Sequence, residues 1–186
     1  MHGDDFHALL WANSGSQRTR FQAIQKAQPM NGRTVLDVGC GRADLLDFLV
    51  GRNLAPSHYV GLEAMDEFAV LAEKKIRNGV MIVRGDFLAE PIKMFVGAEI
   101  VVFSGSLNTL SKEEFFQTIR RAYDATAEVL VFNFLSSSRL AGNNYLTWHV
   151  PRDVMNFCRG LCADVSLHEG YIDGDATIRM AKPEHA

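Results

Sequence analysis

The sequence contains little cysteine and little proline: three cysteines and five prolines among 186 residues. The cysteines, Cys40, Cys158 and Cys162, are odd in number, form no CxxC pair and have no histidine nearby at zinc-ligand spacing. Small secreted scaffolds need paired cysteines, and structural zinc sites need clustered ligands. We therefore expect reduced thiols and no metal site.

Long apolar runs and a strong charge of one sign are also missing. No run approaches the roughly 20 apolar residues that a membrane-spanning helix needs. The first five residues include two acids, where a secretory signal would be basic. A net charge of -3 gives no general attraction for nucleic acid or anionic lipid. These absences predict a cytoplasmic protein with no strong nucleic-acid signal and no membrane partner, and we expect its partner to be a small molecule.

The composition is otherwise that of an average soluble protein, with 47% hydrophobic and 22% charged residues. A chain of this length forms one substantial core but hardly two. From residue 33 onward, short β-branched runs alternate with helical patterns, which is typical of an α/β fold. We expect a single domain over residues 1–186, with a helical extension at 1–32 and a Rossmann-like core at 33–182.

The pattern predicts five strands that alternate with helices, and then a terminal pair of strands. The pair flanks the turn signal Asp173-Gly174-Asp175, and this arrangement predicts an antiparallel hairpin. The expected fold is a Rossmann-like, seven-stranded, mostly parallel sheet with helices on both faces. The predicted strands are 33–38, 58–62, 80–83, 99–103, 129–134, 165–172 and 176–181. The predicted helices include 66–77, one that a capping box at 111–114 opens, and one that begins at Pro151 and reaches about residue 161.

The most informative segment is the glycine-rich turn after the first predicted strand, Thr34 to Asp44. Gly39 and Gly41 let the chain turn sharply and bring backbone amides close to a ligand. An apolar strand, an acid (Asp37) and this turn into a helix together resemble the first motif of class I S-adenosylmethionine-dependent methyltransferases. Ala43 stands where a third glycine is usual, and alanine suits the first turn of a helix.

The resemblance implies that Gly39, Cys40 and Gly41 cradle the methionine part of S-adenosylmethionine and that Asp37 helps to hold its amino group. Dinucleotide-binding proteins have a similar turn, but their fingerprint requires glycine where this chain has Asp44. A carboxylate there would repel a pyrophosphate. A nucleotide-dependent oxidoreductase is therefore disfavoured.

A second acid, Glu63, ends the second predicted strand, 22 positions beyond Gly41. A carboxylate at such a strand end can accept hydrogen bonds from both ribose hydroxyls of a nucleoside. The resemblance makes Glu63 the ribose ligand and places Ala64 and Met65 along the adenine. The alternative is a surface acid that begins the next helix.

The third acid, Asp86, follows the third predicted strand. In the family this acid bonds the adenine amino group, although aspartate is also a common turn residue. Phe87 either stacks on the adenine or belongs to the core.

Small polar residues end the fourth predicted strand, at the sheet edge where ligands of open α/β folds bind. The resemblance implies that Ser104, Gly105 and Ser106 face the methionine part and the transferable methyl group. In related small methyltransferases a leading helix covers the cofactor, so Gln17 or Arg20 would contact it. The alternative is that both residues only cap and solvate an edge helix.

The acceptor side has no recognisable motif. The segment 135–149 is polar and without periodicity, and it is long enough to be a binding loop, although an ordinary surface loop is an equal alternative. Tyr145, Trp148 and His149 are its candidates for shaping a pocket. Of these, Tyr145 and His149 are the candidate catalytic residues, because an unperturbed histidine titrates near neutral pH.

The leading hypothesis is an S-adenosylmethionine-dependent methyltransferase that acts on a small acceptor by in-line displacement. The ordered set of Asp37, the glycines, Glu63, Asp86 and Ser104 carries it. The alternatives are a non-catalytic S-adenosylmethionine-binding module or partner subunit, and the oxidoreductase.

Overall fold

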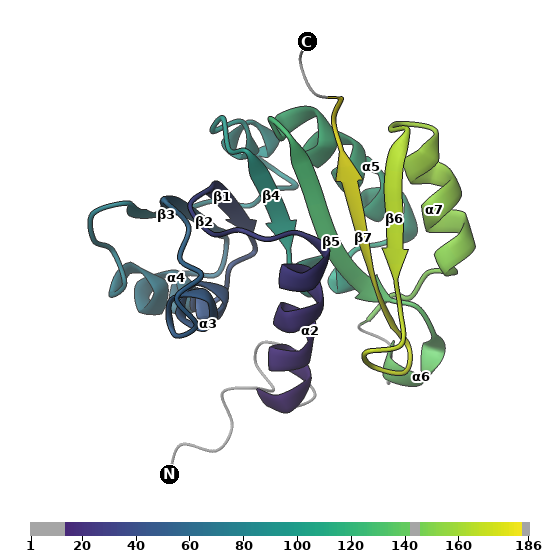
Figure 1. The fold of residues 1–186 in the computed structure, drawn as a ribbon, viewed down its shortest axis with the longest axis horizontal. Helices are drawn as coiled ribbons and strands as arrows, with labels where there is room; N and C mark the ends of the chain where they lie inside the picture. Colours follow the sequence, from purple (N-terminus) through teal and green to yellow (C-terminus); the bar gives the residue numbers. More distant parts are fainter. Residues whose placement is uncertain (1–13, 142–145, 184–186) are drawn as a thin grey trace.

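The computed structural model describes residues 14–141 and 146–183, which form a seven-stranded sheet in the order β3-β2-β1-β4-β5-β7-β6. Neighbouring strands from β3 through β5 pair in parallel, and β7 pairs antiparallel with both β5 and β6. The prediction of a mostly parallel seven-stranded sheet with a terminal antiparallel pair is thus confirmed (Figure 1). The strands are β1 (Thr34–Val38), β2 (His58–Glu63), β3 (Val80–Arg84), β4 (Ile100–Phe103), β5 (Val129–Leu135), β6 (Asp164–His168) and β7 (Asp175–Ala181).

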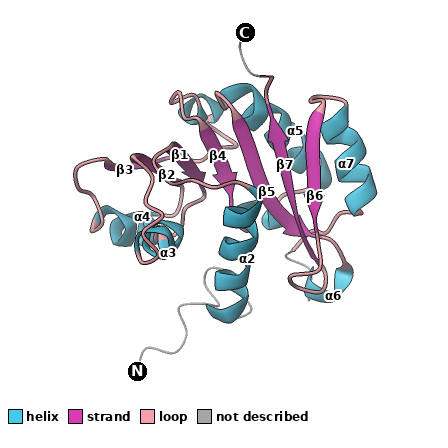
Figure 2. Ribbon diagram, in the orientation of Figure 1, coloured by secondary structure: helices cyan, strands magenta, loops and turns pink. Residues whose placement is uncertain are grey.

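Helices cover both faces of this sheet, as expected (Figure 2). One face packs on α5 and α7, and the other packs on α2 and α3. The helices are α2 (Ser14–Ala27), α3 (Asp44–Val50), α4 (Asp66–Glu73), α5 (Lys112–Ala125), α6 (Ser138–Ala141) and α7 (Pro151–Arg159), with short 3-10 helices η1 (Pro91–Met94) and η2 (Ser106–Thr109). The predicted capping box is present, since Ser111 and Glu114 exchange side-chain to backbone hydrogen bonds at the start of α5.

The strands are continuous apolar runs because both faces of the sheet are buried. All seven residues of β5 are buried, and their side chains alternate between the two helix layers. Phe132 and Phe134 contact Phe115 of α5, whereas Val131 packs in the layer that contains Phe21 of α2. This double cover holds the strand ends in fixed relative positions.

The order in which the strands are added to the sheet reverses between β1 and β4. From β1 the chain adds β2 and β3 on one side, and it then crosses over to add β4 and β5 on the other side. The loops that leave the carboxyl ends of β1 and β4 lie at this point of reversal. In open α/β sheets this is where ligands bind.

Two predicted boundaries were wrong. The helix predicted over 66–77 ends at Glu73, because the chain then turns into β3, closed by a bridge between Arg77 and Val80 and by Gly79 with φ 78°. The terminal strands are joined by six residues, 169–174, and not by the three-residue turn. Gly170 and Gly174 adopt left-handed conformations there, which allows this longer connection.

No helix within the described ranges is long and apolar enough to cross a membrane.

Candidate functional site

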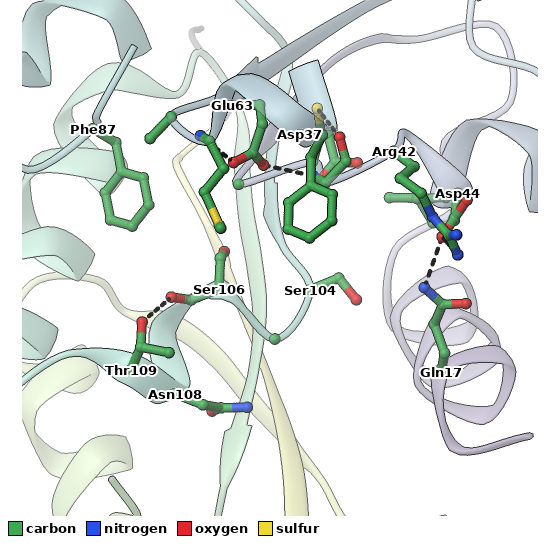
Figure 3. Close-up of a pocket in the computed structure, with 18 of the residues that line it drawn as sticks. Gln17, Asp37, Arg42, Asp44, Glu63, Phe87, Ser104, Ser106, Asn108 and Thr109 are labelled. Atoms are coloured by element: carbon green, nitrogen blue, oxygen red, sulfur yellow. Dashed lines mark hydrogen bonds and ion pairs between the residues drawn. The ribbon is translucent and has the colours of Figure 1, made fainter. Parts of the chain in front are cut away.

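A cavity of about 310 Å³ lies at the carboxyl edge of the sheet, between the loops that follow β1, β2, β3 and β4 and helix α2. Every residue predicted to bind the cofactor lines this cavity. Figure 3 labels Gln17, Asp37, Glu63, Phe87 and Ser104 among them. These residues are Gln17, Arg20, Asp37, Gly39, Cys40, Gly41, Glu63, Ala64, Met65, Asp86, Phe87, Ser104 and Gly105. The fold therefore brings the four predicted motifs and the leading helix around one space. Their binding of a ligand stays a prediction.

Glu63 connects the first two motifs. Its Oε2 accepts a hydrogen bond of 2.7 Å from the backbone N–H of Gly41, and its Oε1 accepts one of 2.8 Å from the N–H of Met65. The side chain is almost completely buried at the cavity wall. Two charge-assisted bonds to backbone amides hold the carboxylate in one orientation. Each oxygen keeps a further lone pair that can accept a hydrogen bond from a ligand hydroxyl.

The glycine-rich loop turns where β1 ends. The N–H groups of Gly39 and Cys40 both donate to the carbonyl of Leu62, at 2.8 and 3.1 Å, which ties the loop to β2. A Cβ on Gly39 would lie 2.4 Å from the Cβ of Ser106, so only glycine allows the β1 and β4 loops to approach this closely. That close approach forms the base of the cavity.

Ala43 was misplaced by sequence reasoning. It does not lie in the first helical turn but precedes α3 as its N-cap, in the left-handed conformation with φ 57° and ψ 43°. A residue with a Cβ is strained in that conformation. This explains why glycine is usual there: the position needs a positive φ.

Asp37 is the most enclosed acid at the cavity. Its side chain is 2% exposed, and its Oδ2 accepts a hydrogen bond of 2.6 Å from the hydroxyl of Tyr59. Burial raises the pKa of the Asp37 carboxyl to about 7, against the lowering effect of the Tyr59 hydrogen bond, and the nearby charges of Glu63 and Asp44 raise it further. A cation bound beside Asp37 would favour its ionised form.

The loop after β3 contributes Asp86, Phe87 and Leu88 to the cavity wall. Asp86 Oδ1 accepts a hydrogen bond of 2.8 Å from the N–H of Leu88, so this acid does shape a turn, as the alternative interpretation required. It nevertheless lines the cavity together with Phe87, whose ring packs edge-on against Phe103 with 5.7 Å between centroids. Phe87 is thus both a neighbour of the core and a cavity wall, and the apolar surface suits a flat ring.

The loop after β4 is held by hydrogen bonds to the two neighbouring strands, β1 and β5. Ser106 Oγ donates to the carbonyl of Val38 at 2.6 Å, and the N–H of Gly105 donates to Asn133 Oδ1 at 2.8 Å. Ser104 Oγ is buried and has no hydrogen-bond partner among the described residues. Figure 3 shows its side chain directed toward the side of the cavity where Gln17 lies.

The two polar α2 residues at the cavity, Gln17 and Arg20, also bond to other parts of the protein. Gln17 Nε2 donates to Asp44 Oδ2 at 3.1 Å, and Arg20 Nε donates to Asp175 Oδ2 at the start of β7. Asp44 additionally contacts Arg42 at 3.3 Å. These bonds fix α2 along one side of the cavity.

Comparison with solved structures identifies the architecture. The chain superimposes with a TM-score of 0.70 on an S-adenosylmethionine-dependent methyltransferase from Archaeoglobus fulgidus, at 15% identity, covering 96% of this chain and 97% of that one. It superimposes with a TM-score of 0.66 on magnesium protoporphyrin IX methyltransferase from Synechocystis PCC 6803 with bound S-adenosylhomocysteine, at 13% identity and 91% and 84% coverage.

The chain has the class I methyltransferase fold.

A third similar structure is a chain from the complex between the Haloferax volcanii Trm112 methyltransferase activator and a putative methyltransferase. It has a TM-score of 0.72 and 14% identity, with 98% of each chain covered. No protein-family model and no curated protein matches the sequence. At these identities the comparisons define the methyltransferase fold but not the acceptor.

In this methyltransferase fold His149, the predicted base, is not among the cavity-lining residues. Its ring stacks on Phe115 with 3.8 Å between centroids, and burial, aided by the charge of Lys112, lowers its pKa to about 4. This environment keeps the imidazole neutral in the core. Trp148 is partly exposed and also does not line the cavity, and Tyr145 lies outside the described residues.

Sequence reasoning missed part of the cavity wall. The apolar residues of the cavity wall belong to no sequence motif, because only their place in the fold distinguishes them from core residues. Asn108 and Thr109 lie in η2, shortly after the fourth strand, so extending the strand-end argument by one turn would have found them. The missed lining residues are Phe21, Arg42, Asp44, Leu45, Phe68, Leu88, Asn108, Thr109, Leu110 and Leu146.

Proposed function

We propose that the protein is an S-adenosylmethionine-dependent methyltransferase with a small-molecule acceptor. One observation carries the proposal: Asp37 in β1, Glu63 at the end of β2 and Asp86 in the loop after β3 line a single cavity. Carboxylates at these positions can accept hydrogen bonds from the ribose and adenine groups of an adenosine and can pair with the cationic amino group of an attached amino-acid chain.

The chemistry of this donor set fits the cofactor. Glu63 would accept hydrogen bonds from the ribose hydroxyls, and Asp86 from the adenine amino group, with Phe87 and Leu88 against the ring. Asp37 would pair with the ammonium of the methionine part. When bound, S-adenosylmethionine supplies a methyl group on a positively charged sulfur. A cavity with several carboxylates is electrostatically suited to such a cation.

The protein's own contribution would be alignment. Holding two reacting groups in line supplies roughly 7 to 11 kcal/mol of the barrier reduction. The loops after β1 and β4 are locked together through Gly39 and Ser106, and α2 is fixed by its bonds to Asp44 and Asp175. These contacts would hold donor and acceptor in a constant geometry.

A nucleotide-dependent oxidoreductase fits less well. Asp44 occupies the first turn of α3, where a pyrophosphate would lie in a dinucleotide-binding fold. The carboxylate would face the phosphates at close range, whereas S-adenosylmethionine has none.

A small acceptor is favoured over RNA by charge. Some proteins with this fold are named for RNA, such as the small RNA methyltransferase HEN1, which this chain resembles at a TM-score of 0.70, 12% identity and 92% coverage, with 26% of the HEN1 chain covered. The net charge here is -3, and RNA binding depends on neutralising phosphates with basic side chains.

Calorimetry tests the cofactor. The wild-type protein is expected to bind S-adenosylmethionine and S-adenosylhomocysteine and not NAD. Glu63→Ala should weaken binding roughly 10- to 100-fold, the value of lost hydrogen bonds to a charged group. Glu67→Ala is the matched control, because Glu67 is exposed on α4 and does not line the cavity. Binding of NAD alone would refute the proposal.

Methyl transfer is tested separately with a labelled donor. Label should appear in the low-molecular-weight fraction of a cell extract and not in added RNA. Label in RNA would refute the small acceptor. Cofactor binding without transfer to any fraction would favour the non-catalytic binding module.

A further inference from the structure

We infer that Tyr59 is a positioning residue: its hydroxyl orients the Asp37 carboxylate toward the amino group of the cofactor and favours the ionised form of that carboxylate. The inference rests on the proposed function and deepens it. Tyr59 does not line the cavity, so any effect on a ligand passes through Asp37.

The placement follows from sheet register. Tyr59 in β2 pairs with Val35 in β1, two residues before Asp37, so the tyrosine and the aspartate lie diagonally on adjacent strands. Gly61, which pairs with Asp37, has no side chain to intervene. The Tyr59 hydroxyl thus reaches Asp37 Oδ2 at 2.6 Å. With Oδ2 engaged from the protein side, the carboxylate is held in one orientation at the cavity wall.

Apart from Asp37, the Tyr59 side chain lies among apolar groups. Tyr59 is 1% exposed in the layer of apolar side chains between the sheet and α3. A buried hydroxyl needs a partner, and an apolar ring of the same shape would satisfy this layer without one. The hydroxyl is therefore explained by Asp37 and not by packing.

The charged groups near Asp37 make this hydrogen bond important. Burial, Glu63 from β2 and Asp44 from α3 all raise the pKa of Asp37, whereas the Tyr59 hydrogen bond lowers it. The nearby cationic side chains form ion pairs with other acids: Lys75 and Arg42 contact Asp44, and Arg20 of α2 contacts Asp175. Cys40, the remaining titratable neighbour, stays a neutral thiol, because burial raises its pKa far above neutrality. Without the Tyr59 hydrogen bond, the pKa of Asp37 would lie higher, and a smaller fraction of the carboxyl would be ionised at neutral pH to pair with an ammonium group.

The test is the pH dependence of S-adenosylhomocysteine affinity in Tyr59→Phe, measured by calorimetry from pH 6 to pH 9. The ratio of variant to wild-type affinity cancels the titration of the ligand itself. Loss of the hydroxyl raises the Asp37 pKa. A rise of about one unit from a value of about 7 lowers the ionised fraction about fivefold at pH 7, so the variant should bind about fivefold more weakly there. At pH 9 both carboxyls are ionised, and the two affinities should agree within about twofold.

Asp37→Asn provides the second readout, because it removes the titrating group. In the Asp37→Asn background, Tyr59→Phe should cause no further loss of affinity. Tyr123→Phe is the matched control, since Tyr123 lies on α5 and does not line the cavity, and it should bind like the wild type. If Tyr59→Phe does not fold, Tyr59→Met removes the same hydroxyl and replaces it in the series.

The outcomes separate the two proposals. An equal loss of affinity at every pH, or no loss at pH 7, overturns the role of Tyr59 while the cofactor proposal stands. Additive losses in the double variant also overturn it. If the wild type binds neither S-adenosylmethionine nor S-adenosylhomocysteine at any pH, the proposed function fails first.

Discussion

Arg20 of α2 and Asp175 of β7, 155 positions apart in the sequence, form a buried ion pair at the side of the cavity. Both side chains are less than a tenth exposed, and the hydroxyl of Tyr171 also donates to Asp175. The pair joins the leading helix to the terminal strands. Since Arg20 lines the cavity, the shape of the cavity depends on a residue from the far end of the chain.

Removing one member of this pair should destabilise the fold strongly. Asp175→Ala leaves the Arg20 guanidinium buried without its carboxylate, and we expect a loss of about 3 to 5 kcal/mol in the free energy of unfolding. Urea denaturation measures it. Asp173→Ala is the control, because the Asp173–Arg139 pair is exposed on both sides and contributes about 0 to 1 kcal/mol. Equal losses in the two variants would contradict a structural role for the buried pair.

His149 should make the protein sensitive to acid. Its pKa is 6.5 when unfolded and about 4 when folded, because burial disfavours the charged ring. The unfolded state therefore binds more protons between these values, and stability is lost as the pH falls from 6.5 to 4, by up to about 3 kcal/mol.

His149→Phe removes this dependence and keeps a ring on Phe115. We expect the variant to be at least as stable as the wild type at pH 7, because the buried Nε2 has no hydrogen-bond partner among the described residues. The difference in stability should grow as the pH falls from 6.5 to 4. Methyl transfer should persist, and its loss in a folded variant would restore His149 as a catalytic candidate.

Asp37 should have the opposite pH effect on stability. Its pKa rises from 3.8 to about 7 on folding, so the folded state binds the extra proton, and stability falls as the pH rises from 4 to 7. Asp37→Asn removes a charge that is costly to bury, and it should stabilise the protein by roughly 2 to 4 kcal/mol at pH 8, with little effect at pH 4.

Thermal unfolding at the two pH values measures the effect, with Asp124→Asn, at an exposed position, as the control. The same variant should lose affinity for the cofactor, because it lacks the anion. A functional site that is costly to stability is a common compromise. A variant less stable than the wild type at pH 8 would show that the ionised carboxylate is well satisfied in the fold.

Ala43→Gly should be close to neutral, although glycine normally destabilises helical regions. Relief of the left-handed strain, about 1 to 2 kcal/mol, offsets the lost methyl burial and the greater freedom of the unfolded chain. Ala69→Gly, at a buried position inside α4, lacks this compensation and should lose at least about 1 kcal/mol. A similar loss at both positions, measured by denaturant unfolding, would argue against strain at Ala43.

The sequence by itself determined the parts of this protein that depend on local pattern. Continuous apolar runs predicted the parallel strands, and the acids at their ends, Asp37, Glu63 and Asp86, predicted the cavity wall. This works because the carboxyl ends of parallel strands meet at one edge of a sheet, so order along the chain becomes proximity in space.

Only the tertiary structure decided which side chains partner one another across the fold. The bonds from Tyr59 to Asp37 and from Arg20 to Asp175, and the stack of His149 on Phe115, depend on register and on helix packing. No spacing in the sequence encodes these distances. The same is true of Ala43, whose left-handed backbone results from the way α3 leaves the glycine loop.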